Sequence, residues 1–362
     1  MTDELYRATF PIFKVDGQVK GELARDITRL EIEESTEGLK TLSARFIAFG
    51  PQPSEQTERL LYLDGQVFDF GKSLEVSLGA PAEARTVFKG AVSAIEASYL
   101  ETREPEVLVM AEDKLMTLRM TRRMRTYKSK TDADIASDIA GLHSLTPDVA
   151  ADGPTYDVVQ QWNQSDLAFL RERAALVQAE IWIEDDRLCF KNRRQQRPRT
   201  ELTLVRGGRL MEVHLRADLA HQRTKVVVSG YDANAKDKIE EEAAGDAVSP
   251  EVERGRSGPS VLQRAFGERV SYRVREVPLT GQEARAFGSE EMCRRARGFV
   301  TVAGTTDGTP DLVVGSRLTL ENVGAAFEGS PYHVTRVLHT YDRESGHRTH
   351  FEAERPTLGN FA

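Results

Sequence analysis

The sequence predicts a mainly β chain with an α+β insertion, containing two similar small β-barrels. Short runs of alternating apolar and polar residues, separated by turn residues, fill both ends of the chain. Helical patterns are confined to the region between these ends and to one insertion further along. A pattern near the C-terminus also recurs near the N-terminus, which indicates an internal repeat.

The C-terminal pattern, residues 304–354, has the form of four short strands. Each run alternates or is rich in β-branched and aromatic residues, and turn residues such as Gly329-Ser330-Pro331 and Glu344-Ser345-Gly346 separate the runs. The expected strands are 312–314, 318–320, 332–339 and 349–354.

The N-terminal third contains a second version of this pattern. Residues 71–76 resemble residues 315–320, with glycine first and apolar residues at matching places. Five further residues recur at one constant offset: Val92, Ile95, Tyr99, Ala111 and Glu112 match Val334, Val337, Tyr341, Ala353 and Glu354. Chance similarity between two β-rich segments is the alternative. Duplication of one small barrel is the hypothesis that organises the rest of the chain.

Residues 1–118 are expected to form the first barrel. Strand-like alternation covers 10–15, 27–32 and 42–49, and Asp16-Gly17 is a turn signal. The runs 60–63 and 67–70 flank Asp64-Gly65, which predicts a β-hairpin. Many short strands at regular spacing favour a barrel or sandwich.

Residues 119–199 are expected to form an α+β middle domain, which begins with a basic run. Its six basic side chains are the candidate partner contacts: Arg119, Arg122, Arg123, Arg125, Lys128 and Lys130. A nucleic-acid-binding arm is one interpretation. Because Met120, Met124 and Tyr127 are interleaved, we favour a strand that begins at Leu115 and is solvated or contacts an acidic partner. The methionines Met116, Met120 and Met124 are expected to pack inward.

Two helices and a hairpin follow in this domain. Thr131 and Asp134 form a near capping box for a helix in which Ile135, Ile139 and Leu142 fall on one face. Ser165 is a helix N-cap with Asp166 in the first turn, and an apolar stripe at 167, 170, 174 and 177 follows. The runs 181–183 and 188–190 predict a hairpin around Asp185-Asp186.

Residues 200–362 are expected to form the second barrel, interrupted by a loop and helix insertion at about 232–298. Alternation resumes near Leu202 and continues at 210–215 and 224–231. Residues 232–260 have loop composition. Thr280 and Glu283 form a capping box for a helix that runs to Ala296 and ends at Gly298.

Composition excludes several classes of protein. The net charge of −8 opposes general nucleic-acid binding, and no apolar run approaches the length of a membrane helix. The N-terminus lacks the pattern of a signal peptide. The two cysteines, Cys189 and Cys293, lie in a strand-like and a helical segment, so a reducing cytoplasm is expected and a disulfide is not.

Candidate catalytic or metal-binding groups do not combine into a site. His333 and His339 share strand parity but lie far apart along the expected strand, and no carboxylate or thiol has ligand spacing with them. Asp185-Asp186 and Glu240-Glu241-Glu242 are adjacent acids of the solvated kind, without an apolar pocket to separate their roles. The chain has no GxSxG, P-loop or GxGxxG motif. We therefore expect no enzyme activity, no cofactor and no metal.

The segment Val159-Gln-Gln-Trp-Asn-Gln-Ser-Asp-Leu-Ala-Phe-Leu-Arg resembles the phage late control protein D family, which also forms the hub of type VI secretion spike proteins. The resemblance continues in order through the helix at 283–296, Gly308-Thr-Pro310 and Gly315. It ends on Tyr332-His-Val-Thr-Arg-Val-Leu-His339 and Phe351-Glu352. It covers most of the chain.

The resemblance implies a structural baseplate hub of a contractile phage tail or a tail-like injection system. Such hubs are homotrimers in which two tube-like barrels per subunit make a pseudo-sixfold ring, adapting a threefold spike to the sixfold tail tube. Implied partners are a spike protein below, a tube or tube-initiator protein above, and wedge or LysM-type adaptor proteins at the side, without membrane or specific nucleic acid.

Assembly in the bacterial cytoplasm and a place in the virion or particle baseplate follow from the same resemblance. Because the chain stops at Ala362, a needle and any lysozyme-like domain are expected on other polypeptides. The alternative function is a tail-associated cell-wall hydrolase.

Overall fold

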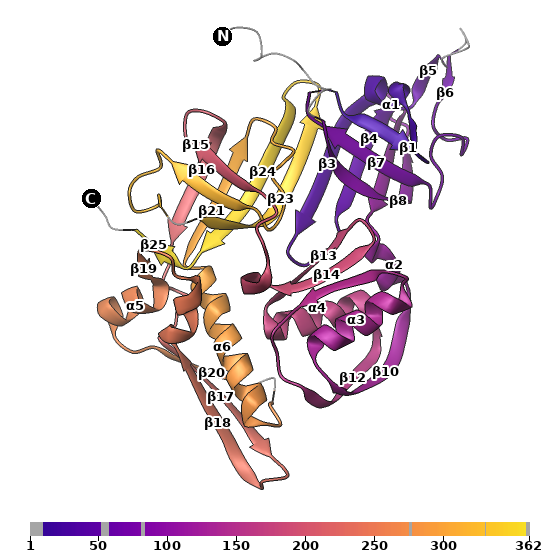
Figure 1. Cartoon of the computed structure of the whole chain (residues 1–362). Coiled ribbons are helices and arrows are strands. Elements are labelled where there is room, and N and C mark those ends of the chain that lie inside the picture. Colours follow the sequence, from indigo (N-terminus) through magenta and orange to yellow (C-terminus); the bar gives the residue numbers. More distant parts are fainter. Residues whose placement is uncertain (1–9, 52–57, 81–83, 275–276, 330, 360–362) are drawn as a thin grey trace. The chain divides into compact units, whose positions relative to one another are not determined.

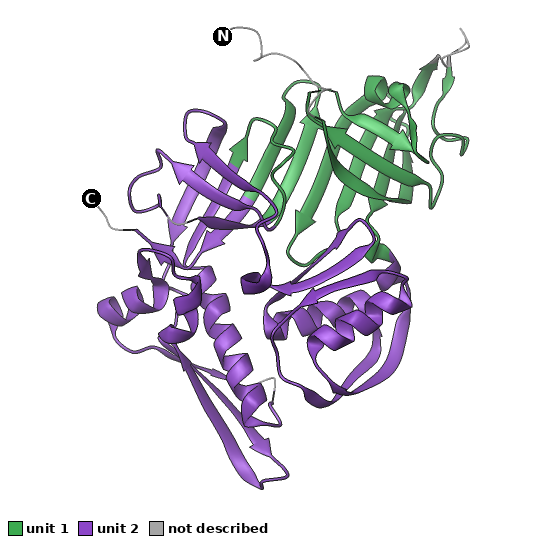
Figure 2. Cartoon of the chain, viewed as in Figure 1, with its two compact units in different colours: residues 1–116, 305–314, 336–351 green, residues 117–304, 315–335, 352–362 purple. Residues whose placement is uncertain are grey.

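The computed structural model describes residues 10–51, 58–80, 84–274, 277–329 and 331–359. The chain divides into two compact units (Figure 2). Unit 1 consists of residues 1–116, 305–314 and 336–351, and unit 2 consists of residues 117–304, 315–335 and 352–362. Both units are formed by segments that lie far apart in the sequence. The long strands near the C-terminus therefore contribute residues to both (Figure 1).

Unit 1 is built mainly from strands of the N-terminal third. They are β1 (Ile12–Val15), β2 (Gln18–Val19), β3 (Ile27–Ser35), β4 (Thr41–Ile47), β5 (Phe49–Pro51), β6 (Glu58–Leu60), β7 (Ser73–Leu78), β8 (Arg85–Ser98) and β9 (Glu106–Glu112). The short helix α1 (Gly21–Asp26) connects β2 to β3, and α2 (Leu115–Met120) begins where the unit ends. The hydrogen-bonded order of the main strands is β1-β7-β8-β9-β4-β3, and β2 pairs with β1.

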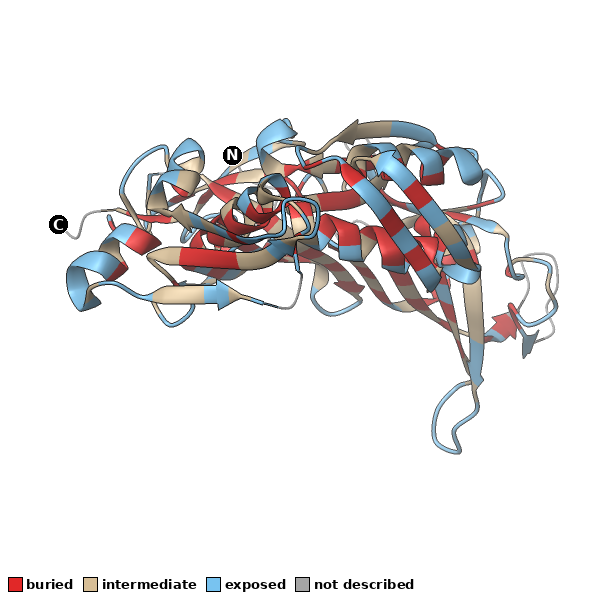
Figure 3. Ribbon diagram, turned by 90° about the horizontal axis from the view of Figure 1, so that it is seen from below, coloured by how far each residue is buried: buried red, intermediate tan, exposed pale blue. Residues whose placement is uncertain are grey.

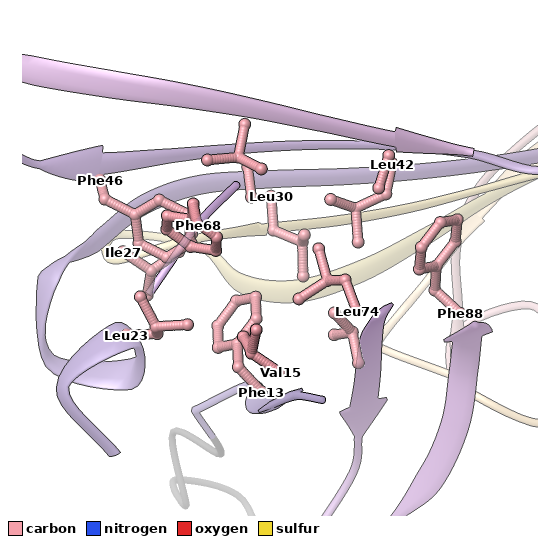
Figure 4. Close-up of a cluster of buried hydrophobic side chains, with 14 of the residues drawn as sticks. Phe13, Val15, Leu23, Ile27, Leu30, Leu42, Phe46, Phe68, Leu74 and Phe88 are labelled. Atoms are coloured by element: carbon pink, nitrogen blue, oxygen red, sulfur yellow. The ribbon is translucent and has the colours of Figure 1, made fainter. Parts of the chain in front are cut away.

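Alternation along these strands creates the core of unit 1, because every second side chain points to the same face. Figure 3 shows buried and exposed residues alternating along the strands. Four aromatic rings, Phe13, Phe46, Tyr62 and Phe68, pack with centroids 5.3–6.0 Å apart. Figure 4 shows Phe13, Phe46 and Phe68 pointing into this cluster together with aliphatic side chains from β3, β4 and β7. The buried apolar area stabilises the unit by the hydrophobic effect.

A second set of strands forms a sheet in the C-terminal half. It consists of β15 (Glu201–Val205), β16 (Leu210–Ala217), β21 (Val300–Thr306), β22 (Arg317–Glu321), β23 (Tyr332–Asp342) and β24 (Gly346–Arg355). Its hydrogen-bonded order is β15-β22-β23-β24-β21-β16. β21, β23 and β24 each have residues in both units.

The two six-stranded modules have the same topology. Matched in chain order, β1, β3, β4, β7, β8 and β9 correspond to β15, β16, β21, β22, β23 and β24, and the two sheet orders then coincide strand for strand. One end differs, because β1 is antiparallel to β7 whereas β15 is parallel to β22. The predicted mainly β chain with two similar barrel-like modules and an α+β insertion is confirmed, and the shared topology supports duplication.

An irregularity in the long strands also repeats. The register of β8 against β9 shifts between Val92 and Ala94, and the burial alternation of β23 shifts between Val334 and Val337. A one-residue shift moves later side chains to the other face of a sheet. His333 and His339 therefore differ in burial, and the expectation from strand parity that they face the same way was wrong.

The insertion between the modules contains two helices between two small sheets (Figure 1). Helix α3 (Asp132–Leu142) begins at the Thr131–Asp134 capping box, and α4 (Asp166–Val177) begins at the N-cap Ser165. Strands β10 (Arg122–Lys130) and β12 (Tyr156–Ser165) pair with each other, and β11 (Thr146–Ala150), β14 (Arg187–Asn192) and β13 (Ala179–Glu184) form a three-stranded sheet. A 3₁₀ turn, η1 (Arg193–Gln195), ends the insertion.

A second insertion lies within the C-terminal half. Strands β17 (Lys225–Asp232), β18 (Asp237–Ala244) and β20 (Val270–Arg273) form a sheet, and the other elements are η2 (Gly245–Glu251), β19 (Arg256–Ser257), α5 (Gly258–Phe266) and α6 (Gly281–Arg297). β19 pairs with β25 (Thr357–Leu358), which follows β24 outside the insertion. One side of α6 packs on β17 and β18, where Gly288 lies against Ala243 and Val228.

Four local predictions were wrong. Residues 60–63 and 67–70 do not form a hairpin, because Leu61, Tyr62 and Phe68 turn into the core of unit 1. Residues 312–314 are a loop, and the preceding strand is β21. Residues 237–244, which were expected to be part of a loop, form strand β18. This strand pairs with β17, and most of its charged side chains are exposed to solvent. Residues 115–120 are helical, so the basic strand starts at Arg122. The boundaries at 118/119 and 199/200 stay predictions.

Substitution of Gly90 tests how closely β8 and β9 pack in the first module. A Cβ at this position would lie 2.2 Å from the backbone oxygen of Glu112, in the neighbouring strand β9. Gly90→Ala is expected to destabilise the protein by about 1–3 kcal/mol through overpacking, measured by denaturant unfolding. Gly141→Ala is the matched control, because nothing lies within 4 Å of its Cβ position in α3, and it should stabilise the protein by about 0.5 kcal/mol. Equal behaviour of both variants would contradict the packing described for β8 and β9.

Candidate protein-interaction surface

The predicted basic contacts lie mainly on the two-stranded sheet β10–β12. The strands are antiparallel, with Met124 opposite Trp162 and Lys128 opposite Val158, and the register shifts between Arg123 and Met124. Because side chains alternate along a strand, this sheet has one face toward helices α3 and α4 and one face toward solvent.

The inner face is held by aromatic packing and by a buried carboxylate. Tyr127 stacks on Phe169 of α4, with ring centroids 5.8 Å apart and an interplanar angle of 13°. Arg123 donates from Nε to the fully buried Asp166 over 2.8 Å. Such contacts fix the backbone of β10 against α4.

Asp166 is the centre of this network. His143 Nε2 lies 2.7 Å from Asp166 Oδ2, and Gln161 Nε2 donates to Oδ1 over 2.9 Å. Burial alone would raise the pKa of the Asp166 carboxyl, but the hydrogen bonds from Gln161, His143 and Arg123 outweigh it and lower that pKa. Asp166 is therefore an ionised structural group that joins β10, β12, α3 and α4.

The outer face combines exposed apolar side chains with positive charge. Met124 is 74% exposed and Trp162 is 66% exposed, and Val158 is also exposed. Arg122 and Lys128 are exposed on the same face, which has no carboxylate at the outward positions 122, 124, 126, 128, 158, 160 and 162. Exposed aromatic and methionine side chains beside cations are typical of protein-binding surfaces. We call these seven positions the β10–β12 face.

The six predicted contact residues differ in their exposure and in their contacts. Arg119, Arg122 and Lys128 are exposed, whereas Arg125 is partly buried. Arg123 binds Asp166, and Lys130 lies 3.1 Å from Asp138 of α3. The exposed Arg122 donates from Nε to the backbone oxygen of Asn163 over 2.7 Å, so all three are bonded within the insertion. Val158 and Trp162 were not predicted to be part of this surface. The alternation of side chains along β12 could have placed them on its exposed face. The expectation that Met120 and Met124 pack inward was wrong, since both are exposed.

The histidines of the C-terminal strands form buried polar contacts. His339 Nδ1 lies 3.1 Å from Thr349 Oγ1 and 3.3 Å from His347 Nε2. Burial, and then the neighbouring imidazole and Lys40, lower the pKa of His339 to about 3. Burial and Arg348 lower the pKa of His347 to about 4. Both rings are neutral near pH 7.

His333 belongs to a different network. Its Nε2 lies 2.9 Å from Glu180 Oε1, and Arg193 also contacts Glu180 over 3.2 Å. Burial opposes ionisation of Glu180, but His333 and Arg193 lower its pKa well below the usual range. Burial and Arg193 lower the pKa of His333. The carboxylate is held by hydrogen bonds from both partners.

One cluster has the donor atoms of a metal site but not the chemistry. Asp148, Glu184 and Cys189 have ligand atoms within 4.8 Å of one another. Lys191 already lies 2.6 Å from Asp148, and burial raises the pKa of the Cys189 thiol to about 12, so it stays protonated. A protonated thiol is a poor metal ligand. Cys189 and Cys293 are both buried free thiols.

A cleft of about 480 Å³ lies within unit 2. It is lined by five arginines and three glutamates, which are Arg193, Arg194, Arg197, Arg317, Arg355, Glu251, Glu253 and Glu354. Arg194 pairs with Glu251 and Arg317 pairs with Glu253. The arginines outnumber the glutamates, so the cleft carries an excess of positive charge.

The sequence matches the Alg8 N-terminal domain family over residues 20–343. The chain belongs to this family. Comparison with curated protein sequences gives no match.

Solved structures with a similar fold include phage tail proteins. The 43 kDa tail protein of prophage MuSo2 from Shewanella oneidensis is 15% identical with a TM-score of 0.66, covering 96% of this chain and 98% of that chain. A tail protein from Neisseria meningitidis is 13% identical with a TM-score of 0.65, covering 96% of each chain. The E. coli c3393 protein, a type VI secretion component, is 13% identical with a TM-score of 0.56, covering 97% of this chain and 79% of that chain. This member of the Alg8 N-terminal domain family therefore has the fold of phage tail proteins.

Within the residues that the structure describes, every helix is too short or too polar to cross a membrane.

Asp166→Ala is expected to destabilise the protein by about 3–5 kcal/mol, because it leaves Arg123, His143 and Gln161 without their shared acceptor. Denaturant unfolding measures this effect. Lys128→Ala, in the same strand as Arg123 but on the exposed face, is the matched control and should change the free energy of unfolding by less than about 0.5 kcal/mol. A small effect of Asp166→Ala would show that the carboxylate does not hold the insertion together.

The free energy of unfolding should fall as the pH is lowered from about 6.5, the ordinary pKa of an unfolded histidine, to about 3. His339 and His347 have folded pKa values of about 3 and about 4, so the unfolded chain binds more protons in this range. Replacing His339 by Gln should reduce the slope of stability against pH between these limits. An unchanged slope in His339→Gln would contradict the buried neutral imidazole.

Proposed function

We propose that this protein is a structural baseplate hub, of the late control protein D type, in a contractile tail or tail-like injection particle. As a homotrimer it would adapt a threefold spike to the sixfold tail tube. The observation that carries the proposal is the repeat of one six-stranded topology within a chain that has a tail-protein fold. Three copies would present six similar modules, which matches the symmetry of a six-membered ring.

The proposed partners differ in where they bind. The spike would bind below the trimer and the tube or its initiator above it, both through the ring of modules. The β10–β12 face lies in the insertion, outside both modules, and its exposed Trp162, Met124 and Lys128 suit an acidic partner with apolar anchors. A wedge or LysM-type adaptor protein at the side of the hub is the occupant that we propose for it.

The role proposed here is non-catalytic, and the particle rather than a membrane would be its location. It would be assembled in the bacterial cytoplasm and then form part of the virion or injection-particle baseplate. The fold similarity to tail proteins and to a type VI secretion component supports this placement.

Mass in solution tests the hub directly. Light scattering of the purified protein is expected to give three times the monomer mass, and the protein should not degrade peptidoglycan. A monomer that cleaves peptidoglycan would contradict the proposal and favour a tail-associated hydrolase.

The β10–β12 face can be tested separately from the trimer. Lys128→Glu combined with Trp162→Ser is expected to leave the trimer mass and thermal stability unchanged while reducing incorporation of the hub into assembled particles at least tenfold. The control is Lys238→Glu combined with Tyr231→Ser, on the exposed β17–β18 hairpin. Equal incorporation of both double variants would show that this face is not a partner contact.

A further inference from the structure

One strand junction in this chain joins the two modules through main-chain pairing. In unit 1, residues 336–342 of β23 pair antiparallel with residues 29–35 of β3. Arg336 Nε donates to Glu33 Oε1 over 2.7 Å across this junction. The edge of β23 is free for β3 because β22 pairs only with the first residues, Tyr332 and His333.

The first module has the corresponding edge without a partner strand. β7 pairs with residues 85–91 of β8, and the opposite edge of β8 pairs with β9 as far as Ser98. Among the strands that the structure describes, none pairs with residues 94–98 on the edge of β8 where β7 lies. Residues 94–98 are the counterparts of 336–340, the part of β23 that β3 covers, by the constant offset of the repeat.

The second module has the corresponding strand without a second neighbour. β16 is the counterpart of β3, and it ends the hydrogen-bonded order of its sheet, with β21 on one side only. Met211, Glu212, His214 and Arg216 along it are exposed. Each chain therefore contains one paired junction, between β3 and β23. It also contains the counterparts of both strands, β16 and residues 94–98 of β8, and in these the corresponding edge has no partner strand.

We propose that β16 of one copy pairs antiparallel with residues 94–98 of β8 in a neighbouring copy, and so repeats between chains the β3–β23 junction within a chain. The proposal rests on the proposed trimeric hub and names its contact. Open strand edges bind other strands through main-chain hydrogen bonds. Repetition of a head-to-tail contact of this kind generates a ring when the rotation closes.

The register of the proposed junction follows from the repeat. The side chain of Thr305 in β21 contacts that of His350 in β24 over 3.0 Å, and counting along both strands places Val302 opposite Ala353. Leu42 of β4 has the same place in the first module, opposite the counterpart of Ala353. Val302 is therefore the counterpart of Leu42, and both are buried.

The same counting carries over to β16. Ile32 of β3 lies opposite Leu42. The backbone N–H of Asp218 donates to the carbonyl of Phe299 over 2.9 Å, which aligns β16 with β21 and places Leu215 opposite the counterpart of Leu42. Leu215 is therefore the counterpart of Ile32, and Arg216 is the counterpart of Glu33.

The side chains that this register brings together are complementary. Glu33 lies opposite Leu338, so Arg216 of one copy would lie opposite Glu96 of the next. Both are exposed, and Arg216 also contacts Asp218, which follows the end of β16. The neighbouring pairs would be Leu215 with Ala97, His214 with Ser98, and Val213 with Tyr99. Opposite charges and apolar pairs facing each other stabilise antiparallel strands.

Engineered disulfides test the junction and its register. In antiparallel pairs the opposed Cα atoms lie about 4.5–5.5 Å apart, within the range that a disulfide spans. The double variant Glu96→Cys, Arg216→Cys is expected to give covalent dimers and trimers on non-reducing denaturing gels after mild oxidation. Ser98→Cys with His214→Cys, at the next pair on the same face, is the second variant. Wild type is the background control, because Cys189 and Cys293 are buried.

Each single variant, and Glu96→Cys combined with Glu240→Cys on β18, should stay monomeric on the same gel. Charge exchange gives an independent reading: Glu96→Arg should lower the trimer fraction at least tenfold at a fixed concentration, and adding Arg216→Glu should restore it. A native trimer that neither double variant cross-links overturns the junction but leaves the hub proposal standing. A wild-type protein that is monomeric at every concentration overturns both.

Discussion

Main-chain hydrogen bonds along a single edge of β23 join the two modules of this chain. β22 covers the start of this edge and β3 covers the remainder, so a strand of the second module is shared with the first. Unpaired backbone groups in a sheet are costly and attract other strands. This arrangement removes one open edge within the chain, and duplication then leaves a corresponding open edge on β8.

Much of the fold could be predicted because alternation and helix caps are local signals. The Thr131–Asp134 and Thr280–Glu283 pairs marked two helix starts, and Ser165 marked a third. The repeat was visible because buried positions such as Val92 and Val334 keep their spacing in both modules. The failures came from tertiary packing. The residues around Asp64-Gly65 have hairpin propensity, yet Tyr62 and Phe68 fill the aromatic core instead.

The candidate surface shows the same limit. The basic run was visible in the sequence. Which of its side chains are bonded within the insertion, and which are exposed, was not. Arg123 is used by the buried Asp166, whereas Trp162 enters the surface from β12, which pairs with β10 across a long stretch of sequence. Pairing of strands distant in the chain decides which side chains share a face, and no local pattern encodes it.

The central claim is that one chain provides two equivalent units of a larger ring. The most direct measurement is a cryo-electron-microscopy reconstruction of the assembled protein, calculated without imposed symmetry. We predict a threefold axis around which the two modules alternate at the same radius, so that the module density repeats at every sixth of a turn. A particle without a threefold axis, or one in which the modules lie at different radii, would contradict it.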